Sequence, residues 1–143
     1  MPDLVVFSVL TDGPVQIVPE VNGRSLVDLV TEFEESRSFT PAGGYAGLVP
    51  AHFTFGDLAR YYLGEEPEQW PKPGHLWLLG CECGEVGCWP LEARVTATDE
   101  TVAWSNFHTP QRAGRDYTGF GPFLFARDHY DLAVRRAIRR GEW

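Results

Sequence analysis

Cysteines and long hydrophobic runs are scarce in this chain of 143 residues. It has only three cysteines, and an odd number excludes a set of internal disulfides that uses every cysteine. The longest apolar run of the first predicted strand, Leu4–Phe7, is far shorter than the ~20 residues of a membrane-spanning helix. Met1-Pro2-Asp3 lacks the basic start of a secretory signal, so we expect a cytoplasmic protein.

Basic residues are also few, with 12 Lys and Arg against 20 Asp and Glu and a net charge of −8. Such an acidic body disfavours general binding to DNA or RNA, which depends on basic residues that neutralise phosphates. The charge is uneven: residues 1–100 carry 16 acids and 5 bases (net −11), whereas residues 101–143 carry 4 acids and 7 bases (net +3). The basic end favours contact with an acidic protein partner or with another copy of the chain.

The composition is that of an ordinary globular protein, with 43% hydrophobic and 22% charged residues. This length is typical of one compact domain, which we expect to span residues 1–143.

Two antiparallel strands are predicted at residues 4–10 and 15–21, because the Asp12-Gly13 step between them is typical of a turn. Pro19 predicts that the second strand lies at a sheet edge or ends there. Ser25 then caps a helix expected over about 26–36, where apolar residues recur at helical spacing. The helix is predicted to turn three acids to solvent: Glu32, Glu34 and Glu35.

The second half predicts a three-strand antiparallel meander over residues 75–83, 88–98 and 101–108, in which Cys83 faces Cys88 and Thr98 faces Thr101. A short helix between Thr54 and Gly64 precedes it, and an amphipathic helix over about 127–140 closes the chain. These elements define an α+β fold with a mainly antiparallel sheet. Its core face is expected to collect Leu76, Leu78, Trp89, Leu91, Ala93, Val95, Ala97, Val102 and Trp104.

The first candidate site is the cysteine hairpin, in which Cys81, Cys83 and Cys88 share one face of the meander. Three thiolates suit zinc, but a structural zinc site requires a fourth ligand, and none lies on the hairpin. A redox disulfide between Cys83 and Cys88 and three inert, packed thiols are the alternatives. No cofactor is expected unless the hairpin binds zinc.

The second candidate site is the polar loop from His108 to Tyr117. Arg112 and Arg115, with Tyr117, are candidates for binding an anionic ligand, because guanidinium groups bind phosphates and carboxylates bidentately. His108 and Asp116 are the candidates for acid–base catalysis. Alternatively, these side chains pair with their neighbours and have only a structural role.

The stretch from Leu78 to Gly84, followed by Gly87-Cys88-Trp89-Pro90-Leu91, resembles that of a group of small bacterial proteins with no assigned activity. The similarity extends to Trp104 and from Tyr117 to Phe125. It implies one domain of a bacterial type and carries no functional residue over to this chain.

No complete catalytic constellation is recognisable in the sequence. The favoured hypothesis is therefore a non-catalytic binding or interaction protein, with its contact surface at a sheet edge or on the basic final helix. The alternatives are a zinc or thiol protein that uses the cysteine hairpin, and an enzyme that acts on a small anionic substrate at the 108–117 loop. Neither nucleic acid nor a membrane is an expected partner.

Overall fold

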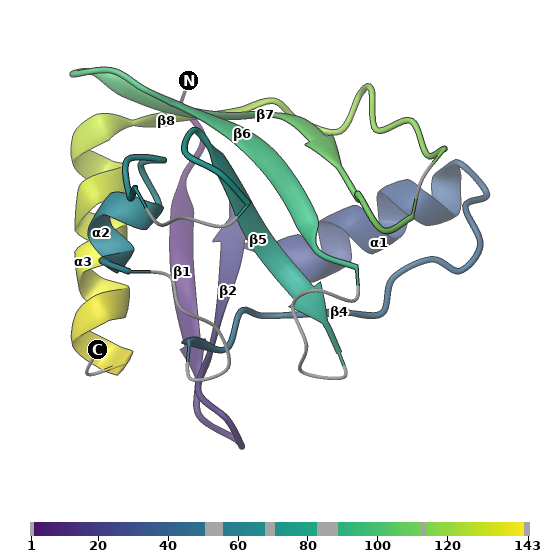
Figure 1. The fold of residues 1–143 in the computed structure, drawn as a ribbon, viewed down its shortest axis with the longest axis horizontal. Helices are drawn as coiled ribbons and strands as arrows, with labels where there is room; N and C mark the ends of the chain where they lie inside the picture. The colour runs from purple at the N-terminus through teal and green to yellow at the C-terminus, as the bar shows by residue number, and fades with distance from the viewer. Residues whose placement is uncertain (1, 51–55, 68–70, 83–88, 113, 142–143) are drawn as a thin grey trace.

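The computed structural model describes residues 2–50, 56–67, 71–82, 89–112 and 114–141, and its mixed helices and antiparallel sheets confirm the α+β prediction (Figure 1). The strands are β1 (Val5–Leu10), β2 (Gln16–Val21), β3 (Arg24–Ser25), β4 (Tyr45–Ala46), β5 (His75–Cys81), β6 (Leu91–Ala97), β7 (Thr101–His108) and β8 (Phe123–Ala126). The helices are α1 (Leu26–Ser36), α2 (Leu58–Tyr61) and α3 (Arg127–Gly141).

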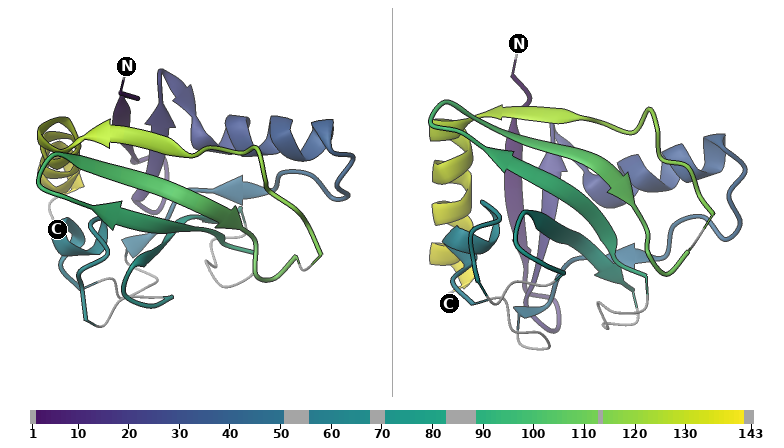
Figure 2. Two further views of the ribbon diagram at one scale, coloured as in Figure 1. Left: turned by 90° about the horizontal axis from the view of Figure 1, so that it is seen from above. Right: turned by 45° about the horizontal axis from the view of Figure 1, so that its top comes forward.

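The strands form a three-stranded sheet in the order β1-β2-β3 and a five-stranded sheet in the order β4-β5-β6-β7-β8. The predicted meander is the β5-β6-β7 part of the larger sheet, which crosses over the smaller one (Figure 2). Helix α3 stands along β1 at one end of the molecule, and α1 extends at the opposite end (Figures 1 and 2).

Aromatic rings join the two sheets at the centre of the core. The ring of Phe7 on β1 lies 4.6 Å from that of Tyr62, 5.7 Å from Tyr130 on α3 and 6.1 Å from Trp104 on β7 (centroid distances). The predicted core face is confirmed, because seven of its members are buried and Trp89 and Ala97 pack, partly buried, against the core. The seven are Leu76, Leu78, Leu91, Ala93, Val95, Val102 and Trp104.

The meander departs from simple pairing through two register shifts, one between Trp77 and Leu79 and one between Glu92 and Arg94. The turn at Thr98 is as predicted, since its N–H donates to the carbonyl of Thr101 at 2.8 Å. The predicted facing of Cys83 and Cys88 lies outside the described residues.

The second strand of the meander was predicted from residue 88, but β6 begins only at Leu91. Pro90, immediately before it, has no N–H for a strand ladder. The indole N–H of Trp89 donates to the carbonyl of Gly44 at 2.9 Å, which ties this part of the chain to the segment before β4.

Pro19 does not place β2 at a sheet edge, because β2 is the middle strand of its sheet. Pro19 lies opposite Phe7 on β1. On the other side of β2, the described pairings join Ile17 to Leu48 and Glu20 to Ser25, so Pro19 falls between them. The missing N–H of proline therefore removes no ladder hydrogen bond.

Capping side chains mark the first turns of α1 and α2. The Ser25 hydroxyl accepts a hydrogen bond from the N–H of Val27 at 3.2 Å, and α1 has the predicted bounds. Helix α2 is shorter than predicted and is capped by Asp57, which accepts from the N–H of Ala59 at 2.9 Å. No helix in the described ranges combines the length and apolar character that crossing a membrane requires.

Candidate functional site

The 108–117 loop folds onto helix α1, where its predicted ligand-binding residues meet one buried carboxylate. Glu34 is fully buried. The hydroxyl of Tyr117 donates to its Oε2 at 2.5 Å, and Nη1 of Arg115 lies 3.2 Å from the same oxygen. Nη1 of Arg112 lies 3.8 Å from Oε1. The structure therefore brings Arg112, Arg115 and Tyr117 together around Glu34.

Gly43, just before β4, and Tyr45, in β4, complete the surroundings of Glu34. The N–H of Gly43 and the hydroxyl of Tyr45 donate to the carboxylate at 2.7 and 2.6 Å. The guanidinium of Arg112 stacks 4.5 Å from the ring centroid of Trp89. Burial and the neighbouring Glu34 raise the pKa values of Tyr45 and Tyr117, so both hydroxyls remain protonated donors.

The expectation that Glu34 faces solvent with Glu32 and Glu35 was wrong. Glu34 follows the buried residues Leu26 and Val30 at helical spacing, which places it on the inner face of α1. The helical spacing of residues 26, 30 and 34 was the sequence signal that could have predicted burial of Glu34. Its negative charge can be buried because two arginines and two tyrosines surround the carboxylate.

The two predicted catalytic residues are not brought together. His108 contacts Glu92 on the neighbouring strand, with Nε2 lying 3.2 Å from Oε2. Asp116 instead accepts a hydrogen bond from the N–H of Thr118 at 2.9 Å. Hydrogen bonding from the Thr118 side chain first, and from its backbone N–H second, lowers the pKa of Asp116. In the described part of the chain, no hydrogen bond or ion pair joins His108 to Asp116.

Glu92 is a second nearly buried carboxylate that the sequence analysis did not single out. Nδ1 of His75 lies 3.3 Å from its Oε2, and the indole N–H of Trp77 donates to its Oε1 at 3.1 Å. His75, Trp77 and Glu92 share the sheet face opposite the buried core residues, because Trp77 pairs with Glu92 across β5 and β6. Burial lowers the pKa of His75 despite the neighbouring carboxylate.

An open hollow of about 410 Å³ lies beside the second half of the loop and is lined in part by Arg115, Asp116 and Tyr117. Two of these groups already have partners, since Arg115 contacts Glu34 and Asp116 binds the N–H of Thr118. The anionic-substrate hypothesis therefore lacks a residue pair placed for acid–base chemistry in this hollow.

Only Cys81 of the three cysteines lies among the described residues, and it is buried opposite Tyr45 of β4. Cys83 and Cys88 lie outside them. Among the side chains that the structure describes, no group of three or more His, Cys, Asp or Glu is placed to hold a metal ion. Zinc binding and redox pairing by the hairpin stay predictions.

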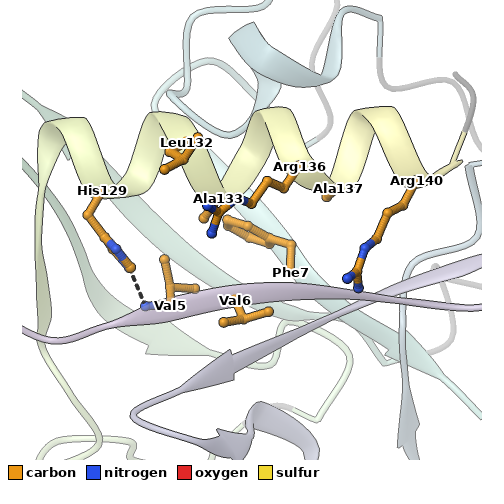
Figure 3. Close-up of a pocket in the computed structure, with 9 residues that line it drawn as sticks. All are labelled: Val5, Val6, Phe7, His129, Leu132, Ala133, Arg136, Ala137 and Arg140. Atoms are coloured by element: carbon orange, nitrogen blue, oxygen red, sulfur yellow. Dashed lines mark hydrogen bonds between the residues drawn. The ribbon is translucent and has the colours of Figure 1, made fainter.

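A groove runs between strand β1 and helix α3 at the other end of the molecule (Figure 3). We call it the β1–α3 groove, and its volume is about 160 Å³. The N–H of Val5 donates to Nε2 of His129 at 2.8 Å, which joins the two walls at one end. The groove is lined by Val5, Val6, Phe7, His129, Leu132, Ala133, Arg136, Ala137 and Arg140.

Four arginines occupy the second half of α3: Arg135, Arg136, Arg139 and Arg140. Only Arg136 and Arg140 line the groove. None of the four makes an ion pair with a described residue. Other arginines of the chain do, as shown by Arg24 with Glu32 and by Arg127 with Asp131.

No protein family, curated protein or solved structure matches the chain.

Proposed function

We propose that this protein is a small cytoplasmic interaction protein, without catalytic activity, that binds an acidic segment of a partner protein in the β1–α3 groove. The observation that carries the proposal is the pair Arg136 and Arg140, which line an apolar groove and make no ion pair with a described residue. The chain has 20 acids and 12 bases, yet none of the carboxylates that the structure describes forms an ion pair with these two guanidinium groups.

Charge complementarity identifies the occupant. Carboxylates that enter the groove would meet two positive charges beside apolar side chains, where ion pairs are stronger than in open water. The net charge of −8 repels acidic molecules elsewhere on the surface, so attraction at α3 would also orient the partner as it approaches.

Exposed apolar side chains next to the groove support a protein partner rather than a small anion. Val6 is 54% exposed and Leu132 37%, and both line the groove. Leu4, just before β1, and Leu10, at the end of β1, are also exposed. Large apolar side chains that gather beside a charged rim are typical of protein interaction surfaces.

A second copy of the chain fits the groove less well. A two-fold dimer through this patch would have to be self-complementary, so the arginines of one copy would need carboxylates on the same patch of the other copy. The lining of the β1–α3 groove includes no Asp or Glu, which favours a different, acidic partner.

The test measures, by fluorescence anisotropy, how tightly the protein binds a labelled short peptide. In the peptide, one leucine is followed by two glutamates, with a serine between each of these residues and the next. Replacing Arg136 and Arg140 by Glu should weaken binding at least about tenfold and reduce its dependence on salt. Replacing Arg135 and Arg139 by Glu is the matched control, because it changes the same charge on the same helix outside the groove.

Equal losses from the two double variants would reduce the effect to general electrostatics and overturn the proposal, as would the absence of binding. Light scattering at several protein concentrations tests whether a second copy of the chain occupies the groove instead. A dimer that dissociates in the Arg136→Glu, Arg140→Glu variant would replace the acidic partner with a second copy.

A further inference from the structure

The hydrogen bond at one end of the β1–α3 groove requires a particular protonation state of His129. A backbone N–H can only donate, so Nε2 of His129, which lies 2.8 Å from the nitrogen of Val5, must be an unprotonated acceptor. The imidazole in this contact is therefore uncharged and carries its proton on Nδ1. Figure 3 shows the ring directed from α3 toward the strand, and both residues line the groove.

Protonation of His129 would turn this contact into two donors that face each other. The N–H of Val5 would lose its acceptor, although Val5 is buried. A buried N–H without a partner costs free energy, and so does an imidazolium without a counter-charge. A carboxylate removes both costs, because its oxygens accept from both donors and its charge is opposite. With His129 protonated, this end of the groove has the chemistry of a carboxylate site.

The described part of the protein supplies no carboxylate to this position. Strands β1 and β8, which contact α3, carry no titratable side chain, and the groove lining contains no Asp or Glu. The described acids of α3, the N-terminal segment and the β6–β7 turn form no ion pair with His129. They are Asp3, Asp99, Glu100, Asp128 and Asp131. The carboxylate must therefore come from a ligand.

The basic groups around His129 link its proton to that ligand. On α3, Arg136 and Arg140 line the same groove, and α2 and β7, which also contact α3, carry Arg60 and His108. Positive neighbours disfavour an additional proton on His129 while the groove is empty. An acidic ligand reverses this balance, so its binding favours protonation and protonation favours its binding.

We infer that the protonated imidazole of His129 and the N–H of Val5 form a carboxylate-binding position in the β1–α3 groove, separate from its two arginines. This inference rests on the proposed function and adds its regulation by pH. Histidine changes its charge between about pH 5 and 8, so the groove binds an acidic segment more tightly as the pH falls through that range. His129 precedes Arg136 by about 10.5 Å along the helix, so a ligand that reaches both carries several acidic residues.

The direction of the pH effect separates His129 from the rest of the groove. Arginine keeps its charge throughout this range. The glutamates of a ligand begin to lose charge as the pH approaches their usual pKa of about 4.3, which weakens their ion pairs. Arginines alone therefore predict constant or weaker binding at lower pH, whereas protonation of His129 predicts tighter binding.

The test measures fluorescence anisotropy with labelled octaglutamate whose two ends are blocked, at about pH 7.5 and about pH 5.5 and at constant ionic strength. Eight residues span about 12 Å when helical and more when extended, so the peptide can reach His129 and the arginines in either form. The wild type should bind about tenfold more tightly at the lower pH.

Two variants assign the pH effect to one histidine. His129→Gln should lose the increase in affinity, because the amide oxygen of glutamine accepts hydrogen bonds but takes up no proton in this range. His108→Gln is the matched control and should keep the increase, since His108 contacts Glu92 and does not line the groove. Circular dichroism checks that both variants fold.

Calorimetry of the wild type needs no variant. The heat of octaglutamate binding at about pH 6.5, measured in two buffers with different ionisation enthalpies, gives the number of protons taken up per peptide. Proton uptake should accompany binding, and its absence would overturn the inference.

The two proposals fail in different ways. If octaglutamate binds through Arg136 and Arg140 equally well at both pH values, or if His129→Gln keeps the increase, the His129 position is wrong and the acidic-partner proposal stands. Loss of the increase in His108→Gln as well would reduce the effect to general charge and also overturn the His129 position. If neither octaglutamate nor the leucine peptide binds at either pH, both proposals are overturned.

Discussion

The hydroxyl of Tyr117 donates a 2.5 Å hydrogen bond to the carboxylate of Glu34, a residue 83 positions earlier in the chain. This contact joins the loop after β7 to helix α1, and Arg115 strengthens the connection by donating to the carbonyl of Pro41 at 2.6 Å as well. The side chains of Arg112 and Arg115 are only 8% and 10% exposed, and the carboxylate of Glu34 supplies the opposite charge that offsets the cost of burying them.

Glu34→Gln should destabilise the protein by about 3–5 kcal/mol, because it leaves two nearly buried guanidinium groups without a counter-charge. Glu35→Gln, on the exposed side of the same helix, should change the free energy of unfolding by less than about 0.5 kcal/mol. Urea unfolding of both variants measures the difference. Equal stability of the two variants would show that Glu34 is not the required counter-charge.

All five tyrosines should resist ionisation while the protein is folded, because burial raises each pKa above its usual value near 10. Tyrosines in the unfolded chain lose protons above about pH 10, so stability should fall as the pH rises through that value. Absorbance at the tyrosinate band, recorded with circular dichroism, should change in one step with unfolding. Tyrosinate formed near pH 10 by a folded protein would contradict this.

Acid should destabilise the protein partly through His75. Burial lowers the pKa of His75, the carboxylate of Glu92 opposes that effect, and nearby basic groups add to it. These basic groups are Lys72, His108 and Arg94. The unfolded chain then binds more protons below pH 6.5, so stability falls as the pH drops through that value. His75→Gln should lose less stability than the wild type between about pH 7.5 and about pH 5.5 in urea unfolding. An identical loss in both proteins would remove His75 as the cause.

Gly64→Ala should be far more destabilising than Gly74→Ala, although both glycines have positive φ, +75° and +85°. A Cβ at residue 74 meets nothing within 4 Å, so that variant should cost only the backbone strain of about 1–2 kcal/mol. A Cβ at residue 64 would lie 2.5 Å from Cγ1 of Val95, which adds about 1–3 kcal/mol of overpacking. Chemical denaturation measures the free energy of unfolding of the two variants. Equal losses of stability would contradict the predicted clash between the new Cβ and Val95.

Local sequence signals determined much of the fold. The spacing of Leu26 and Val30 after the Ser25 cap predicted α1, and the alternation of Val102 and Trp104 predicted the buried face of β7. These predictions succeed because a side chain's direction follows the period of its own helix or strand. The bulges in the meander were not predictable in this way, since they depend on how neighbouring strands pair.

The sites were decided by tertiary structure. The sequence by itself identified Arg112, Arg115 and Tyr117 as a polar group and α3 as a basic helix, but it did not supply their partners. The loop meets Glu34 across 83 positions, and His129 meets Val5 across 124. Chemical type is a local property of the chain, whereas the pairing of a carboxylate with a guanidinium, or of a helix with a strand, depends on which distant surfaces the core packs together.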